Sequence, residues 1–425
     1  MVGFCCVALV LVVILRSSSK VATSYEQHVK LDENFDLAWR ISEGAAEIEF
    51  HASAELLDTS GLANDVSLYV CDTNMTQHLQ EEDYCFLFNG TLRFSSLFNC
   101  FQPLVTLGKD SPTVVFAEDA TLRLPDEKQL LLVAHYENIL QDEGILTNST
   151  LRLWLAPHEE ITKESGMTIS QWLVQSRPRT LGQFLFIPPR QSGFITYAYV
   201  SGDCSSLLLG GGGSVKIVAV GAVRMNRAGS AIRVRHSRKG TELRPVVTED
   251  RYPFDFRHRY YLREPVEFLP GDELRVECQY DTSDRVNVTT GGLNSADAEM
   301  CQVFLEVAHS STGGRKDALL TTSWDPDDAL RHLDAQSGFE AGNHFMVLDQ
   351  QNNSVPLREF LDTQVNWRRA DFQEWARNAP QVVVCSVFEG RTMRMWYDRS
   401  PVVITQPYQE VPNVVPFSAS VSGTE

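Results

Sequence analysis

The chain alternates between apolar and polar residues in many short stretches, which is typical of half-buried β-strands. Ala46–Ala54 (AEIEFHASA) shows this alternation plainly. Further short runs rich in β-branched and aromatic residues lie between turn residues: Ser67–Cys71, Thr113–Phe116, Gln129–Tyr136, Leu151–Leu155, Phe194–Val200, Ser214–Val223, Ala231–His236, Val266–Phe268, Leu274–Tyr280 and Gln302–Ala308. Short strands at this spacing predict an all-β fold of two antiparallel sandwiches in tandem.

The pattern changes after about Ser310. Leu357–Ala379 carries apolar residues at helical spacing and stops at Pro380, so one or two helices are predicted there. Gly210–Gly213 is expected to form a flexible loop on the second sandwich. The last 20 or so residues are expected to drape over the surface or to fray.

The N-terminus indicates entry into the secretory pathway. Val2–Leu15 is almost wholly apolar, which is too short to span a bilayer core but suits the apolar region of a signal peptide. Small residues at Ala22–Ser24 offer a cleavage zone, so residues 1–23 are predicted to be the signal peptide. Basic residues follow the apolar run and none precedes it, which leaves an uncleaved membrane anchor as the alternative. The predicted location is therefore secreted or luminal, with no membrane contact unless the signal is uncleaved.

Glycosylation sequons and cysteines agree with an extracellular setting. Five Asn-x-Ser/Thr triplets occur, at Asn74, Asn89, Asn148, Asn287 and Asn352. Seven cysteines follow the predicted signal: Cys71, Cys85, Cys100, Cys204, Cys278, Cys301 and Cys385. In an oxidising compartment they are expected to form disulfides. Because seven is odd, at least one thiol is free or links the chain to another, so a disulfide-linked or non-covalent oligomer is possible.

Composition and motifs exclude several functions. The 425 residues are 43% hydrophobic and 22% charged, as in an ordinary globular protein. A formal net charge of −18 argues against nucleic-acid binding, because phosphate backbones repel a polyanion. The sequence contains no G-x-S-x-G, H-E-x-x-H, P-loop or G-x-G-x-x-G motif. Its ten histidines include no adjacent pair and no pair spaced by one residue, so no two on one strand face could grip a single metal.

Pro270–Cys301 carries a more specific signal. It contains a Gly-Asp turn, a strand ending in a cysteine, a Gly-Gly turn and a Glu-Met-Cys segment, through these residues: Gly271-Asp272, Cys278, Tyr280, Thr282, Arg285, Gly291-Gly292 and Glu299-Met300-Cys301. This pattern resembles the second domain of the copper type II, ascorbate-dependent monooxygenases, the family of dopamine β-hydroxylase, its monooxygenase-like relatives and peptidylglycine α-hydroxylating monooxygenase.

The resemblance extends over most of the chain, roughly from Ala46 to Cys385. It includes five further segments: Leu62–Cys71, Leu132–Asn138, Ile187–Pro189, Ala228–Glu242 and Val355–Cys385. Tyr25–Ile41 is similar to the opening strand of a DOMON domain. The resemblance implies two jelly-roll-like β-sandwiches, at residues 46–172 and 173–310, between a DOMON remnant at 24–45 and a C-terminal extension, partly helical, at 311–425.

The resemblance also implies six copper ligands, and most of them are replaced. At the first copper the family uses a His-His pair and the His of Val-His-Tyr, and at the second it uses His-x-His and the Met of Glu-Met-Cys. The corresponding residues here are Asn64, Asp65 and His135 at the first site, and Arg224, Asn226 and Met300 at the second. Copper cycling between its +1 and +2 states favours imidazole and thioether donors, and Arg224 brings a permanent positive charge. The resemblance therefore predicts that catalysis is lost and that only His135 and Met300 remain as remnant ligands.

Two histidines could in principle replace the missing ligands. His236 and His258 lie near the second site in sequence. The favoured interpretation is that both are surface imidazoles in Arg-rich stretches.

The resemblance also bears on the cysteines, because it implies disulfides Cys278–Cys301 and Cys71–Cys100. Cys85 and Cys204 are left to pair with each other, to stay free or to link chains. The resemblance places the partner of Cys385 in the missing part of the DOMON domain.

The sequence thus predicts a secreted, non-catalytic homologue that binds a partner protein or a small ligand in the cleft between the sandwiches. Two alternatives stay open. One is an active hydroxylase with altered ligands, using copper and ascorbate as cofactors. The other is a structural extracellular glycoprotein.

Overall fold

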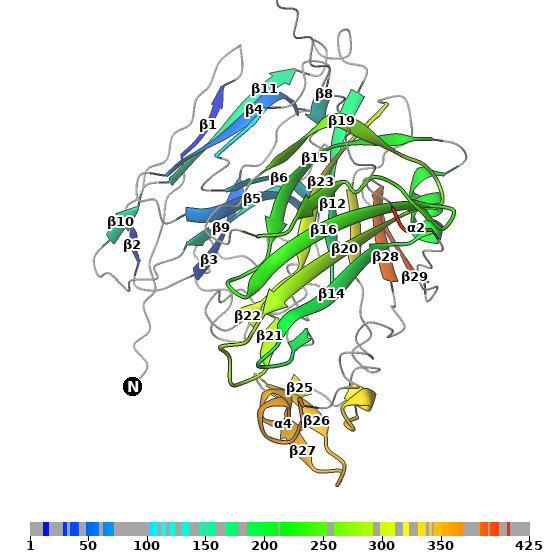
Figure 1. Cartoon of the computed structure of the whole chain (residues 1–425). Helices are drawn as coiled ribbons and strands as arrows, with labels where there is room; N and C mark the ends of the chain where they lie inside the picture. Colours follow the sequence, from blue (N-terminus) through cyan, green and yellow to red (C-terminus); the bar gives the residue numbers. More distant parts are fainter. Residues whose placement is uncertain are drawn as a thin grey trace, which may run out of the picture.

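The computed structural model describes a nearly continuous body between residues 167 and 310, together with separate elements on either side of it. The described residues are 12–16, 29–31, 35–41, 48–58, 63–71, 102–108, 112–115, 120–123, 129–136, 145–147, 149–157, 167–176, 185–210, 213–252, 259–291, 298–310, 318–322, 330–336, 340–341, 344–368, 383–389, 392–398 and 406–408. These residues form a mostly β structure with several antiparallel sheets (Figure 1).

Five strands of the described chain form an antiparallel sheet on one side of the central body. Its order is β14-β20-β16-β17, with β18 also paired to β16. The strands are β14 (Ser192–Val200), β16 (Gly229–Arg238), β17 (Thr241–Glu242), β18 (Val247–Glu249) and β20 (Asp272–Asp281). In β20, with the sequence DELRVECQYD, neighbouring side chains point to opposite faces of the sheet. Leu274, Val276 and Cys278 are therefore wholly buried, while Arg275 is partly exposed.

The largest sheet of the described chain has twelve strands and reaches from the central body to the N-terminal elements. Its main order is β1-β11-β4-β8-β12-β23-β15-β19, and β7, β24, β28 and β29 attach beside this path. The strands are β1 (Val12–Arg16), β4 (Ile48–Asp58), β7 (Thr113–Val115), β8 (Ala120–Arg123), β11 (Ser149–Pro157), β12 (Met167–Gln175), β15 (Val215–Arg224), β19 (Tyr260–Phe268), β23 (Gln302–Ser310), β24 (Ala318–Thr322), β28 (Val383–Glu389) and β29 (Thr392–Asp398).

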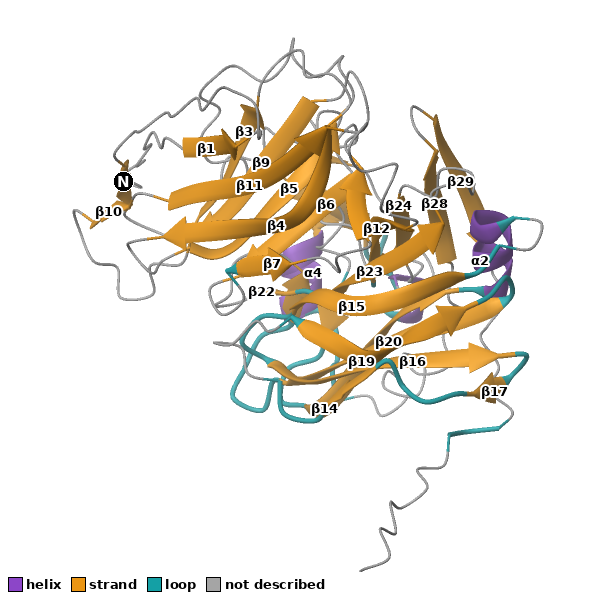
Figure 2. Ribbon diagram, turned by 90° about the horizontal axis from the view of Figure 1, so that it is seen from above, coloured by secondary structure: helices purple, strands orange, loops and turns teal. Residues whose placement is uncertain are grey.

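The core of the central body lies between these two sheets (Figure 2). Alternate residues of β23, among them Val303 and Leu305, meet the inward side chains of β14, β16 and β20 in one buried cluster. Trp172 of β12 is fully buried and packs edge-on against Phe268 of β19, with ring centroids 5.6 Å apart. Burying such large side chains stabilises the fold by roughly 1.5–3 kcal/mol for each one that leaves water.

A four-stranded antiparallel sheet in the order β3-β9-β5-β6 lies beside the central body. Its strands are β3 (Phe35–Ile41), β5 (Ala63–Cys71), β6 (Gln102–Gly108) and β9 (Gln129–Tyr136). A two-stranded pair, β2 (Val29–Leu31) with β10 (Ile145–Thr147), lies at the same end. Two of these strands carry the residues at the first implied copper position: Asn64 and Asp65 lie in β5, and His135 lies in β9.

Short elements complete the described chain. They are β13 (Phe186–Ile187), β21 (Thr289–Gly291), β22 (Ala298–Glu299), β25 (Glu340–Ala341), β26 (His344–Leu348), β27 (Ser354–Pro356), α2 (Gly202–Leu209) and α4 (Leu357–Thr363). Helix α2 begins where the Ser201 hydroxyl accepts a hydrogen bond from the Cys204 backbone N–H. In the described part of the chain, no helix has the length and apolar character needed to cross a membrane.

Each predicted strand overlaps a strand of the structure, so the mostly β prediction is confirmed. The helical prediction over Leu357–Ala379 is correct only at its start, because α4 ends at Thr363 and residues 364–368 are not helical. After α4, the indole Nε1 of Trp367 donates a hydrogen bond to the carbonyl of Leu361, 2.8 Å away, which turns the chain back on itself. Residues 369–379 lie outside the described chain, and the predicted domain boundaries stay predictions.

Two disulfides join parts of the described chain. One links Cys278 to Cys301, the pair implied by the resemblance. The other links Cys204 of α2 to Cys385 of β28. The expectation that the partner of Cys385 had been lost with the DOMON domain is therefore wrong, because β28 pairs with β24 next to β12 and brings Cys385 to α2. The predicted Cys71–Cys100 bond and Cys85 fall outside the described side chains.

Candidate functional site

Backbone pairing brings together the three residues at the first implied copper position. Asp65 of β5 lies directly opposite His135 of β9 in the antiparallel register. Asn64 falls at an irregularity in the same pairing, between Ala63 and Asp65. Asp36 of β3 is the register partner of His135 on its other side. The side chains here are outside the described residues, so this position is defined by its backbone alone.

Arg224 occupies the second implied position and is buried. It is the last residue of β15, is 2% exposed, and sits opposite Gln302 in the pairing with β23. Its guanidinium carbon lies over the ring of Phe304, 5.0 Å from the centroid. This is the geometry of a cation–π contact, which stabilises a buried positive charge. A guanidinium has no lone pair to give to a metal.

Asn226 is held by hydrogen bonds across the same end of the sandwich. Its side-chain Nδ2 donates to the carbonyl of Ala298 at 2.9 Å, and its backbone N–H donates to Glu299 Oε2 at 2.8 Å. The backbone N–H of Ala228 donates to Glu299 Oε1 at 2.6 Å. These bonds fasten the turn between β15 and β16 to the segment that precedes Met300.

Glu299 has no exposed surface and acts as the buried anchor of this turn. Burial raises the pKa of Glu299 to about 7, although the hydrogen bonds from the Ala228 and Asn226 backbone favour its charged form. The guanidinium of Arg285 lies 3.7 Å from Oε1 and also favours the carboxylate. Through hydrogen bonds with two backbone N–H groups, the buried Glu299 carboxylate therefore stabilises the turn between β15 and β16.

Met300 is partly buried and lies between two fixed neighbours. The Tyr280 hydroxyl donates a hydrogen bond to the Met300 carbonyl at 3.1 Å, and Cys301 is tied to Cys278. Tyr280 is itself fully buried and shares a 3.2 Å hydrogen bond with the Thr196 hydroxyl. The structure thus holds the Met300 backbone rigidly, close in the chain to the residues that fasten Asn226.

The residues at the second position do not fit copper. One is a buried guanidinium, and another, Asn226, uses its amide N–H on a carbonyl, which leaves the thioether of Met300 as the one donor of the kind that copper favours. Within the described residues, no group of three or more His, Cys, Asp or Glu side chains is placed to hold a metal ion.

His236 corrects one sequence prediction. It was expected at the surface, but it is 2% exposed, and its Nε2 lies 2.9 Å from Asp272 Oδ2. Arg238 binds the same carboxylate through Nε and Nη2, at 2.8 and 2.9 Å, and the Leu269 backbone N–H binds it at 2.8 Å. This cluster lies at the opposite end of β16 from Arg224, so His236 has a structural role. His258 lies outside the described residues.

Two of the predicted glycosylation sites can be placed. Asn287 and Asn352 are both exposed, and Asn352 lies in the turn between β26 and β27 with a φ of 62°. Asn74, Asn89 and Asn148 lie outside the described residues. Both described sequons are therefore accessible to a glycosyltransferase.

Comparison with known proteins shows what the central body is similar to. Residues 179–312 match the family profile described as copper type II ascorbate-dependent monooxygenase, C-terminal domain. Over these residues the chain is therefore similar to the C-terminal domain of that family.

Its relatives point to the DBH-like branch. DBH-like monooxygenase protein 1 of Homo sapiens is 33% identical over 186 residues, covering 42% of this chain and 28% of the relative. The protein of the same name from Gallus gallus is 28% identical over 258 residues, covering 58% and 39%. Dopamine beta-hydroxylase of Canis lupus familiaris is 29% identical over 176 residues, covering 41% and 26%. The chain matches less than half the length of each of these relatives.

Sequence reasoning missed several residues that shape the site. Glu299 was noted only as part of the Glu-Met-Cys segment, and its burial against the β15–β16 turn could not be read from local sequence. The stacking of Arg224 on Phe304 depends on the register of β15 and β23, which pairs residues nearly 80 positions apart along the chain. The Gly271-Asp272 turn was noted only as part of the family resemblance, and the contacts of Asp272 with His236 and Arg238 were not predicted.

Proposed function

We propose that this chain is a secreted homologue of the DBH-like monooxygenases that has lost its copper chemistry and acts as a binding protein. The observation that carries the proposal is the buried guanidinium of Arg224, which lies over Phe304 where the family resemblance calls for a copper-binding imidazole. A fixed positive charge at this point repels Cu(I) and Cu(II) alike.

The finer architecture is part of the proposal. The two face-to-face sheets of the central body support a jelly-roll-like second sandwich, and the sheet containing β5 and β9 supports a first one. Two disulfides and the exposed sequons Asn287 and Asn352 support passage through an oxidising secretory compartment. The bound molecule would be a protein partner or a small ligand held between the sandwiches.

Copper stoichiometry tests the proposal. The full chain is purified from a secreting host, reconstituted with Cu(II) and ascorbate, desalted and measured for bound copper, with ascorbate-driven oxygen uptake followed in parallel. We expect far less than one copper per chain and no oxygen uptake above that of the buffer. One or two tightly held coppers would overturn the proposal.

An engineered variant supplies a positive control. Arg224→His combined with Asn226→His creates a His-x-His pattern upstream of Met300, and it removes the buried positive charge. This variant should gain copper relative to the natural chain, since imidazole nitrogens replace a guanidinium and an amide. Asn226→His alone retains Arg224 and should gain much less. Equal copper binding by the natural chain and the double variant would show that Arg224 does not exclude the metal.

A further inference from the structure

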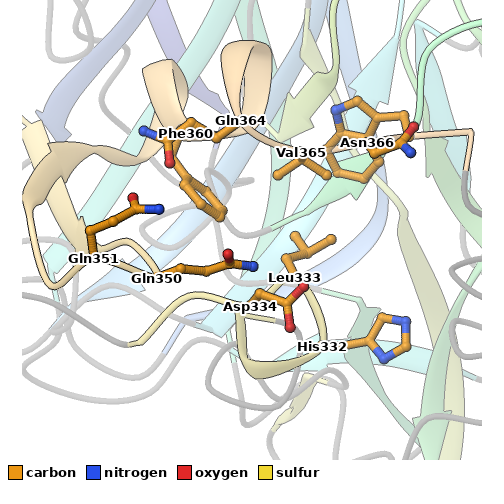
Figure 3. Close-up of a pocket in the computed structure, with 10 residues that line it drawn as sticks. His332, Leu333, Asp334, Gln350, Gln351, Phe360, Gln364, Val365 and Asn366 are labelled. Carbon is orange, nitrogen blue, oxygen red and sulfur yellow. The ribbon is translucent and has the colours of Figure 1, made fainter.

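A polar cavity is lined by residues of the C-terminal part of the chain, none of which belongs to either implied copper position (Figure 3). Its walls come from the end of α4, the turn between β26 and β27, and the short segment 332–334. Its volume is about 360 Å³. This is within the range of small-molecule sites, which run from roughly 300 to 1,000 Å³.

The inner part of the cavity is apolar and fixed. Leu333 and Phe360 are 7% and 3% exposed, so little of either side chain reaches solvent. Trp367 is partly buried, and its indole Nε1 donates a hydrogen bond to the carbonyl of Leu361 at 2.8 Å. That bond holds the indole ring in place, so that an aromatic surface is already formed before any ligand arrives.

The outer part of the cavity is a ring of carboxamides. Gln350, Gln351, Gln364 and Asn366 all line it and all are exposed. Figure 3 shows Gln350 extending between the β26–β27 turn and Leu333. Each carboxamide carries both a donor and an acceptor, and the Gln364 side chain also hydrogen-bonds the Asp349 carboxylate. Such groups allow paired hydrogen bonds to neighbouring groups of a ligand that also donate and accept.

The turn that carries two of these carboxamides is pre-organised. The carboxylate of Asp349 accepts hydrogen bonds from the backbone N–H groups of Gln351 and Asn353, at 2.9 and 2.8 Å. The Asp349 backbone N–H donates to the carbonyl of Asn353 at 3.0 Å. Since the loop is closed on itself, little conformational entropy is lost when a ligand binds to it.

The charges that line the cavity narrow the class of ligand. Among its described lining residues, Asp334 is the one carboxylate, His332 is the one imidazole, and none is Lys or Arg. An anionic ligand would find no strong cation here, and a multivalent cation would find a single carboxylate. A neutral molecule with several hydroxyls and one apolar face matches both the carboxamide ring and the aromatic floor.

We propose that this cavity binds a neutral sugar residue. The vicinal hydroxyls of a pyranose donate to and accept from carboxamides, and the C–H face of its ring packs on an aromatic side chain. The sugar has two possible sources, a glycan on another molecule or a glycan attached to this chain. Asn352 is an exposed sequon residue one position from Gln351, which brings the second source within reach. The proposal does not depend on whether copper is bound.

Ligand-observed NMR on the full glycosylated chain tests the proposal. The probes are glucose, mannose, galactose and N-acetylglucosamine, with glucuronate and glucosamine as charged comparators. At least one neutral sugar should show saturable binding, either to the natural chain or to the Ser354→Ala variant that lacks the Asn352 sequon, with a dissociation constant on the order of 1 mM, as expected of a small neutral ligand held by hydrogen bonds. Absence of saturable binding by every neutral sugar to both proteins, or preference for a charged comparator, would overturn the proposal.

Variants locate the binding and identify the source. Gln350→Ala with Gln351→Ala should weaken binding about tenfold through the loss of hydrogen bonds, while Gln336→Ala, an exposed carboxamide outside the cavity, should not change it. Equal binding by all three proteins would show that the sugar sits elsewhere. Ser354→Ala removes the Asn352 sequon: binding that appears only in this variant identifies the chain's own glycan as the natural occupant, and unchanged binding identifies an external one.

Discussion

Asp272 is the residue whose substitution most sharply tests the packing of the central body. It begins β20 and accepts hydrogen bonds from His236, from both guanidinium nitrogens of Arg238 that face it, and from the Leu269 backbone, all at 2.8–2.9 Å. It is 1% exposed. Asp272→Asn keeps the shape but removes the charge, and it turns an N–H group toward one of these donors. Breaking a buried charge pair in this way costs about 3–5 kcal/mol of unfolding free energy.

The loss of unfolding free energy in Asp272→Asn should depend on pH, because the pKa of Asp272 is shifted in the folded chain. Burial alone raises the pKa of Asp272, but the hydrogen bonds from His236, Arg238 and the Leu269 N–H outweigh it and lower the pKa from 3.8 to about 2. At 1.36 kcal/mol per pH unit this is about 2.5 kcal/mol, and solvent screening of the partly exposed Arg238 reduces it to about 2 kcal/mol. Because the folded-state pKa is depressed, this stability is present above pH 3.8 and is lost as the pH falls through 2.

The assay is denaturant unfolding with disulfides intact, at pH 7 and at several values down to 2. The difference between the natural chain and Asp272→Asn should shrink by about 2 kcal/mol over this range. Asp281→Asn is the matched control, since Asp281 ends the same strand but is exposed; it should change the unfolding free energy by less than about 0.5 kcal/mol. A cost for Asp272→Asn that is the same at pH 2 and pH 7 would refute the reasoning.

Three further substitutions test other parts of the structure by the same unfolding assay. Replacing Cys204 and Cys385 together by serine should cost about 4–5 kcal/mol, since their bond closes a loop with a sequence separation of 181; no change would show that the bond is not formed. Gly229→Ala should cost about 2 kcal/mol, because its new Cβ would lie 2.5 Å from Met225 Cε and 2.8 Å from Met225 Cβ; a neutral effect would mean that the turn adapts. Tyr280→Phe should cost roughly 1–2 kcal/mol, because the variant lacks the hydroxyl that donates a 3.1 Å hydrogen bond to the Met300 carbonyl; a stabilised variant would contradict this hydrogen bond.

The strands of the central body were predictable because their side chains alternate in a two-residue period. The segment Asp272–Asp281 shows why: a buried face and a partly exposed face leave their pattern directly in the sequence. Helix α2 was missed because its sequence GDCSSLLL is short and its three leucines give no helical period. The helix over Leu357–Ala379 was overextended, since the spacing of Phe360, Leu361 and Val365 fits a helix whether or not the chain turns back after Thr363.

The candidate site was predictable only in part. Family resemblance identified Arg224 and Asn226 as replaced ligands, but not what they contact, because those contacts depend on the pairing of β15 with β23 and on the position of Glu299. The sugar cavity left no sequence motif at all. Its carboxamides come from separate segments that only the folded chain brings together.

The bond between Cys204 and Cys385 has a consequence for proteolytic processing. It closes residues 204–385 into a covalent ring that contains most of the central body. A protease that cuts this ring once releases no fragment, so the product remains one particle of unchanged mass until a reductant separates its two chains. A single cut within these residues would therefore not separate fragments on a non-reducing gel, and two fragments would appear only after reduction.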